Sequence, residues 1–202
     1  MEKGKLSLDM LIGLSVFLFT FIFVTNFLPG VFADVRNEIN LAHQAYRLSA
    51  LLVEDPGYPM SWYEDVNLSN CKSKEFRPGL IVMGKEGLNR KEYNHLDLNK
   101  TKKFAELMND ADCKAEIKKY LGLDLRVLNS SFFYGFNVSL KNMDDSILLK
   151  DSQPLLNHGD SSLGMQVMRF ERIVYLDRSL VDNCNLSVGE RCVAKLEVRV
   201  WI

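Results

Sequence analysis

Residues 1–33 read MEKGKLSLDMLIGLSVFLFTFIFVTNFLPGVFA, and this stretch decides how the chain is organised. No charged side chain occurs in the 24 consecutive positions from Met10 to Ala33. A helix that rises about 1.5 Å per residue spans the roughly 30 Å of a bilayer's hydrocarbon core with a segment of this length. Because a lone segment in lipid has to satisfy its own backbone hydrogen bonds, the stretch predicts a membrane-spanning helix.

The charges that flank the apolar stretch give it a preferred orientation. Glu2, Lys3 and Lys5 precede it with a small positive excess, whereas Asp34 and Glu38 follow it with Arg36 between them. Because cytoplasmic flanks carry the excess of basic residues, we expect a cytoplasmic N-terminus and an extracellular domain after Ala33.

Asp9 places a carboxylate at the start of the apolar run. An unpaired charge at this position is costly and usually indicates a dedicated partner. No basic residue follows Asp9 at helical spacing, so we expect its partner to come from the N-terminal flank or from another molecule.

The residues Lys3-Gly4-Lys5-Leu6-Ser7-Leu8-Asp9, followed by the long apolar run, resemble the class III signal peptide of archaeal type IV pilin-like proteins. The resemblance implies cleavage by a prepilin peptidase between Gly4 and Lys5, which leaves the helix attached. Asp9 would occupy the position where these pilins usually carry Glu. The chain departs from the usual pattern at Lys5, where Gln is common, and at Gly13, where Leu is common.

The same resemblance implies a surface filament subunit, major or minor, whose partners are other pilin-like subunits. Its helix would first span the membrane and later pack in the filament core. Cleavage before Lys5 would create an α-amino group with an unperturbed pKa of about 8, a cation available to a neighbour's Asp9. Two alternatives stay open, an uncleaved single-span anchor and a secreted protein cut after Val31-Phe32-Ala33, either of which would carry an extracellular binding or adhesion module.

The remainder of the chain is long enough for one domain with a substantial core. It contains no strong charge bias, since the whole chain has 25 basic and 26 acidic residues, and nucleic acid is therefore not an expected partner. The sequence Gly159-Asp160-Ser161-Ser162-Leu163-Gly164 misses the spacing of a serine hydrolase turn by one residue. We expect neither an enzyme nor a cofactor.

Four cysteines lie in the expected extracellular part, and an even number in an oxidising compartment favours disulfides. Of the three possible pairings we prefer Cys184 with Cys192, which closes a short loop, and by elimination Cys71 with Cys113. The alternative is that some of them are small buried thiols. A metal site is not expected, because there is no C-x-x-C and the three histidines, His43, His95 and His158, are far apart in sequence.

Five N-x-S/T sequons also lie in this part of the chain, an excess that predicts N-glycosylation. Their acceptor residues are Asn67, Asn99, Asn129, Asn137 and Asn185.

The sequence divides into a leader (residues 1–4), an apolar helix (5–33), an amphipathic helix (34–55) and an extracellular α+β domain (56–202). Pro29 and Gly30 predict a kink or a break between the two helices. The stripe of the second helix is expected at positions three and four apart, namely Val35, Ile39, Ala42, Ala45 or Tyr46, Ser49 and Leu52. Asp55-Pro56-Gly57 ends this helix.

The extracellular domain is expected to combine one further helix with an antiparallel sheet of about four strands. Asn99 is the predicted N-cap of a helix that stops at Gly122, with a solvated lysine face formed by residues 100, 102, 103, 114, 118 and 119. The predicted strands are 80–83, 132–140, 165–176 and 193–201, which are rich in β-branched and aromatic residues. The polar stretch 144–163 is expected to be a surface loop.

Overall fold

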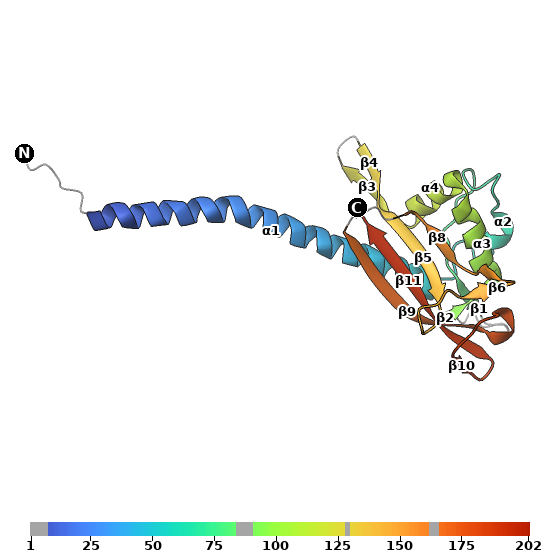
Figure 1. The fold of residues 1–202 in the computed structure, drawn as a ribbon. Helices are drawn as coiled ribbons and strands as arrows, with labels where there is room; N and C mark the ends of the chain where they lie inside the picture. Colours follow the sequence, from blue (N-terminus) through green and yellow to red (C-terminus); the bar gives the residue numbers. More distant parts are fainter. Residues whose placement is uncertain (1–7, 84–90, 128–129, 162–165) are drawn as a thin grey trace, which may run out of the picture. The chain divides into compact units, whose positions relative to one another are not determined.

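The computed structural model describes residues 8–83, 91–127, 130–161 and 166–202 (Figure 1). The chain divides into two compact units, Met1–Asn40 and Leu41–Ile202. The division falls inside the first helix, seven residues after the predicted boundary at Ala33. The predicted leader cleavage between Gly4 and Lys5 lies outside the described residues.

Helix α1 (Leu8–Glu54) is one uninterrupted helix, so the two predicted helices are a single element. Pro29 lies inside it, and the predicted break at this position is wrong. The fixed backbone angle of proline is itself helical, and its cost is one missing N–H donor and a clash with the preceding turn. The helical residues on both sides therefore continue through Pro29, and α1 ends only where Asp55-Pro56 follows.

The part of α1 within the second unit buries an apolar stripe. Leu41, Ala45, Leu48 and Leu52 are at most 1% exposed and recur at intervals of four, three and four residues. Such spacing places them on one face of the helix. The prediction began this stripe too early, because Val35 and Ile39 remain exposed.

In the described part of the chain, α1 is followed by three shorter α-helices and a 3-10 helix. They are α2 (Trp62–Asp65), α3 (Leu98–Asn109), α4 (Ala111–Tyr120) and the 3-10 helix η1 (Arg178–Leu180). The predicted single helix is thus two helices, because Asp110 has extended backbone angles and its carboxylate accepts hydrogen bonds from the first turn of α4. Asp97, not the predicted Asn99, is the N-cap of α3, since its carboxylate accepts from the backbone N–H groups of Asn99 and Lys100.

One lysine of the expected solvated face is buried. Lys100 is 3% exposed, and its Nζ donates to the carbonyls of Pro56 (2.8 Å) and Ile81 (3.1 Å). Desolvation lowers the pKa of Lys100 from its usual value, although Asp97 and Asp55 act against this shift. Lys100 therefore ties α3 to the segment that follows α1.

The main sheet has seven strands in the order β1-β2-β9-β11-β5-β8, with β10 paired to β11. Their bounds are β1 (Ile81–Met83), β2 (Lys91–Leu96), β5 (Gly135–Lys141), β8 (Asn157–Gly159), β9 (Val167–Asp177), β10 (Ser187–Val188) and β11 (Arg191–Trp201). The sheet is antiparallel except for the contact between β2 and β9. Two small hairpins lie apart from it, β3 (Asp124–Val127) with β4 (Ser130–Phe133) and β6 (Leu149–Lys150) with β7 (Gln153–Pro154).

The α+β class is confirmed, whereas the predicted number of strands was too low. The strands β1, β2, β5, β9 and β11 account for most of the sheet, and only β2 among them was not expected. The stretch 144–163, expected as a loop, contains β6, β7 and β8 in its described part. These strands have two or three residues each, too few to show an alternating pattern.

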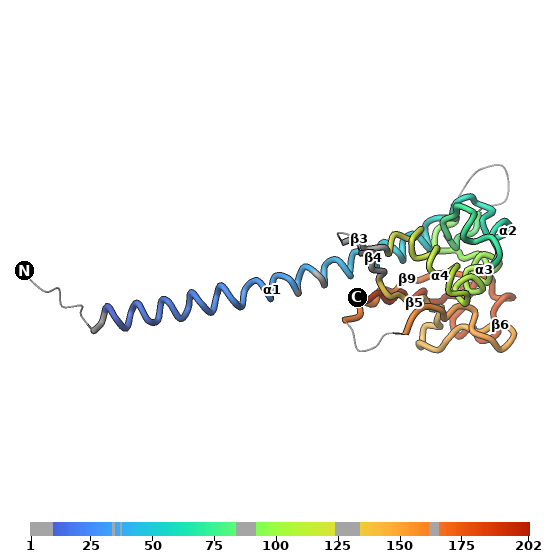
Figure 2. Tube along the Cα trace, turned by 90° about the horizontal axis from the view of Figure 1, so that it is seen from above, coloured from blue at the N-terminus to red at the C-terminus, as the bar shows by residue number. Residues whose placement is uncertain are grey.

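The helices pack on the face of the sheet that carries even-numbered side chains of β5, β9 and β11. Lys118 of α4 lies over the ring of Phe136 at 5.9 Å, and Tyr46 of α1 meets Phe170 edge-on at 5.4 Å. Helix α3 lies beside α4 in both Figure 1 and Figure 2. The core between helices and sheet includes Leu52, Phe104 and Val198, all with no exposed surface.

Candidate functional site

The first candidate site is the surface of α1 between Met10 and Ala33. Every side chain in this range is exposed, and the apolar ones include Phe19 at 74% and Phe32 at 67%. The hydroxyl groups of Ser15, Thr20 and Thr25 donate hydrogen bonds to backbone carbonyls three or four residues earlier in the same helix. Within the described residues, α1 is the one helix whose length and composition suffice to cross a membrane. Asp9 lies in this helix, directly after its first residue.

The structure contains both disulfides in the pairing preferred from the sequence. Cys71 is joined to Cys113 and Cys184 to Cys192, so no cysteine is free. The first bond ties the segment after α2 to the first turn of α4. Asp110 lies near this disulfide. Because the sulfur atoms of Cys71 and Cys113 are bonded to one another, they are not thiolate ligands for a metal ion.

The four described sequons differ in their surroundings. Asn67 and Asn185 are exposed outside the helices and strands, and Asn99 is exposed in the first turn of α3. Asn137 is half-buried in β5, where it pairs with Gly159 of β8 and Arg199 of β11. Asn129 lies outside the described residues. By accessibility, Asn67 and Asn185 fit a glycosylation acceptor best.

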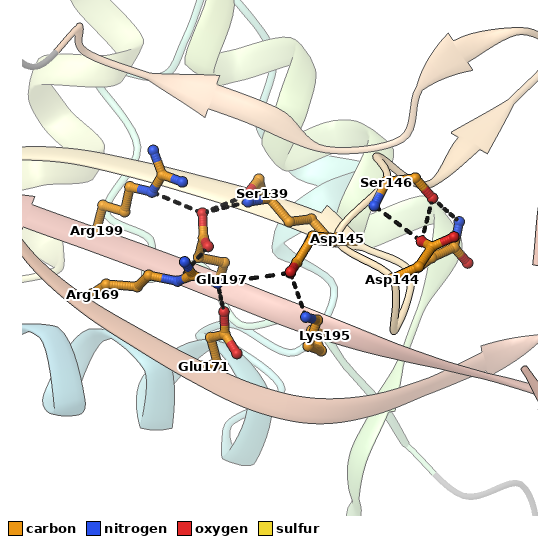
Figure 3. Close-up of polar contacts among 11 residues, drawn as sticks. Ser139, Asp144, Asp145, Ser146, Arg169, Glu171, Lys195, Glu197 and Arg199 are labelled. Carbon is orange, nitrogen blue, oxygen red and sulfur yellow. Dashed lines mark hydrogen bonds and ion pairs between the residues drawn. The ribbon is translucent and has the colours of Figure 1, made fainter. Parts of the chain in front are cut away.

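The second candidate site is a network of charges on the sheet face opposite the helices, here called the Glu197 network (Figure 3). It was not anticipated from the sequence. The register across the three long strands creates it, because it places like charges directly opposite one another: Lys195 opposite Lys141, Glu197 opposite Glu171, and Arg199 opposite Arg169.

Attraction in the network runs diagonally between strands and between residues two apart on one strand. Glu197 of β11 lies 2.8 Å from Lys141 Nζ, 2.8 Å from Arg199 Nε and 2.6 Å from Arg169 Nε. The contact with Arg169 is close, but Oε2 accepts no hydrogen bond from the residues that the structure describes, whereas Lys141 donates a hydrogen bond to Oε1. The side chain of Glu197 is 1% exposed, although it lies on the polar face of the sheet, because these long cationic side chains cover it.

Two acids complete the network at its rim. Asp145, in the turn after β5, pairs with Lys195 and lies 3.7 Å from Arg169. Glu171 pairs with Arg169 as well. Burial raises the pKa of Glu197, but Lys141 and Arg199 outweigh this effect and hold it below its usual value. A carboxylate whose pKa is held below its usual value by neighbouring cations is a poor general base.

Asp160 of the near-miss hydrolase stretch is also paired. It lies 3.1 Å from Lys114 and 2.6 Å from Lys118 of α4. Burial raises its pKa, but the two lysines outweigh that effect and lower it. Asp160 therefore joins the end of β8 to α4, and its carboxylate is engaged by lysines.

Comparison with known proteins found a family model and a relative that match this chain. Residues 1–76 match the model of a family of unknown function (DUF7287). Over 201 residues the chain is 48% identical to a protein of Archaeoglobus fulgidus described as uncharacterized, and the match covers 100% of this chain and 99% of that relative. The chain belongs to the family of this archaeal protein.

The family match over residues 1–76 includes α1, α2 and Cys71. It thus covers the whole apolar helix together with the first part of the disulfide-bonded unit, and it ends before β1. No solved structure matches the chain.

Proposed function

We propose that the chain is an archaeal type IV pilin-like surface subunit, anchored in the membrane by α1 before assembly. The observation that carries the proposal is the continuous helix Leu8–Glu54, whose residues from Met10 to Ala33 are exposed and uncharged. Such a surface requires an apolar environment, either lipid or neighbouring helices. A helix that serves in the membrane first and in a filament later meets this requirement in both places.

The second unit carries features expected outside the cell. Two disulfides persist in oxidising compartments, and the exposed sequons at Asn67 and Asn185 are accessible for glycosylation. In this proposal the N-terminus is cytoplasmic, a prepilin peptidase cuts between Gly4 and Lys5, and Leu41–Ile202 forms the extracellular domain. The 48% identical relative comes from an archaeon, and the leader resembles those of archaeal pilin-like proteins.

Asp9 has a defined role in this proposal. Its carboxylate pairs with the new α-amino group of a neighbouring subunit as filaments grow. Removing one partner of a buried pair typically costs about 3 to 5 kcal/mol, because the other charge stays desolvated. Head-to-tail contacts repeat along an open array, so the cost recurs at each addition.

The test compares wild type with Asp9→Ala and with the control Glu38→Ala, an exposed acid of the same helix. Each protein is quantified in the membrane fraction and in the sheared surface fraction. We expect Asp9→Ala to be inserted and cleaved normally but nearly absent from the sheared fraction, with Glu38→Ala like wild type. Equal partition of Asp9→Ala and wild type would remove Asp9 from assembly, and an absence of sheared wild-type protein would favour a membrane-anchored binding module.

A further inference from the structure

Asn26 is a polar side chain in the middle of an apolar surface. Its Nδ2 donates to the carbonyl of Ile22 at 2.8 Å within the same helix. An amide has a second N–H and a carbonyl oxygen that accepts. Among the described residues, none binds this second N–H or Oδ1. The hydroxyl groups of Ser15, Thr20 and Thr25 differ, because each donates its single proton to the helix itself.

A second acceptor lies beside it. In a helix the carbonyl of residue 25 accepts from the N–H of residue 29, but Pro29 has no N–H. The carbonyl of Thr25 therefore lacks its usual donor, one residue from the side chain of Asn26. Lipid offers no donors in the hydrocarbon region, so these groups stay unsatisfied unless another protein segment supplies a partner.

The surroundings of Asn26 suit such a segment. A shallow groove around it is lined by Phe19, Ile22, Phe23 and Phe27. One turn further on, a Cβ added at Gly30 would meet nothing within 4 Å. At about 100° per residue, Ile22, Asn26 and Gly30 lie on the same side of the helix, whereas Val24 points to the opposite side.

We propose that α1 associates in the membrane with α1 of a second copy through reciprocal hydrogen bonds between the two Asn26 side chains. An amide is complementary to itself, because its N–H can donate to the carbonyl of an identical group. Two copies inserted in the same direction hold Asn26 at the same depth, so the side chains meet without any adjustment of register. The first N–H of each amide stays on the Ile22 carbonyl, so the second N–H makes the bond to the partner's Oδ1, and the Thr25 carbonyl offers that second N–H an alternative acceptor. Gly30 lets the helices approach closely.

This dimer rests on the membrane-spanning role of α1 and goes beyond the proposed filament. A parallel two-fold pair is closed, whereas subunits in a filament are displaced along its axis and form an open array. Asn26 side chains at equal depth therefore define a state in the membrane that precedes assembly.

The experiment uses the full chain in native membranes with single added cysteines, since the four natural cysteines are already bonded. Ile22→Cys places a thiol on the Asn26 side and Val24→Cys on the opposite side. Mild oxidation followed by non-reducing electrophoresis is expected to give dimers for Ile22→Cys and little dimer for Val24→Cys. Equal cross-linking of both, or of neither, would overturn the proposal.

Substitutions of Asn26 in the Ile22→Cys background identify the cause. Asn26→Leu should weaken dimerisation by roughly three- to thirtyfold in the dissociation constant, the range for polar contacts between membrane helices. Asn26→Gln, which keeps the amide, should restore it, and Thr20→Val should leave it unchanged because its hydroxyl is engaged within the helix. Unchanged cross-linking in Asn26→Leu would overturn the proposal.

N-terminal sequencing of the same samples separates this inference from the proposed function. A mature protein that begins at Lys5 but does not dimerise would overturn the dimer alone. A protein that begins at Asp34 has lost α1 up to Ala33, and both proposals would then fail.

Discussion

At the scale of single residues, Glu197 is the side chain on which the outer face of the sheet depends. The strand register brings Lys195 opposite Lys141 and Arg199 opposite Arg169, and like charges that face each other across strands are destabilising. Glu197 lies at the centre and contacts three of these cations. Without it, the sheet would hold four neighbouring cations with only the rim acids Asp145 and Glu171.

We therefore expect Glu197→Ala to lower the free energy of unfolding by about 1 to 3 kcal/mol, less than for a fully buried pair because the Arg169 and Arg199 side chains are 48% and 41% exposed. The exposed acid Glu75 provides the control, because Glu75→Ala should change the free energy of unfolding by less than about 0.5 kcal/mol. Chemical denaturation of both variants measures the difference. A loss of unfolding free energy in Glu197→Ala no larger than that in Glu75→Ala would show that the network does not stabilise the fold.

The lowered pKa of Glu197 also predicts how stability depends on pH. A carboxyl whose folded pKa lies below its unfolded value stabilises the fold at pH values above the unfolded pKa, about 4.3 for Glu. This contribution is lost as the pH falls from there through the folded pKa, when the folded state must also bind the proton. In Glu197→Gln the free energy of unfolding should therefore fall less steeply as the pH is lowered. The difference in slope corresponds to at most one bound proton. Denaturation midpoints measured between pH 6 and pH 2.5, roughly the range in which carboxyl groups titrate, test this, and identical slopes for the two proteins would refute it.

At the scale of elements, the structure and the sequence-based prediction differ in the residue that caps the N-terminus of α3. Asp97 accepts hydrogen bonds from two backbone N–H groups, whereas Asn99 is an exposed residue of the first turn. Asp97→Ala should destabilise the protein by about 1 kcal/mol, and Asn99→Ala by much less. Thermal unfolding of the two variants measures this, and the reverse order would restore Asn99 as the cap.

The two disulfides should contribute unequally. Cys71 and Cys113 are 42 residues apart, whereas Cys184 and Cys192 are 8 apart. Chain-entropy estimates give about 4 kcal/mol for the larger loop and about 2.5 kcal/mol for the smaller one. Replacing each pair by alanines and measuring unfolding would compare them. A larger loss for the pair Cys184–Cys192 would contradict this order.

The sequence predicted the elements that carry long periodic patterns and missed those that depend on the assembled fold. Three local features were predicted in this way, and the structure contains them: the apolar run, the strand that includes Val193-Ala-Lys195-Leu-Glu197, and the short loop closed by Cys184 and Cys192. Lys100 was expected in solvent because its sequence neighbours are polar, yet distant carbonyls at Pro56 and Ile81 bury it.

The candidate sites divide in the same way. The exposed surface of α1 could be predicted from composition alone. The Glu197 network could not, because its members come from β5, β9, β11 and a turn, and only the register between strands brings them together. The unsatisfied amide of Asn26 was visible as a polar residue in an apolar run, but its role depends on which hydroxyl and amide groups bind the helix itself.

At the scale of the whole molecule, the two units have different requirements. Leu41–Ile202 buries its own core and closes it with two disulfides. The described part of Met1–Asn40 is a helix with exposed apolar side chains, so this unit depends on lipid or on other helices. The proposed surface subunit, held in the membrane and then assembled, would combine these two requirements in one chain.

N-terminal sequencing of the mature protein from its native cells tests this account most directly. The proposed function predicts a first residue of Lys5, because a prepilin peptidase removes the leader and leaves α1 attached. A mature protein that begins at Met1 would be a simple anchor, and one that begins at Asp34 would be secreted without the apolar helix. Either of these two results would contradict the assignment as a pilin-like subunit.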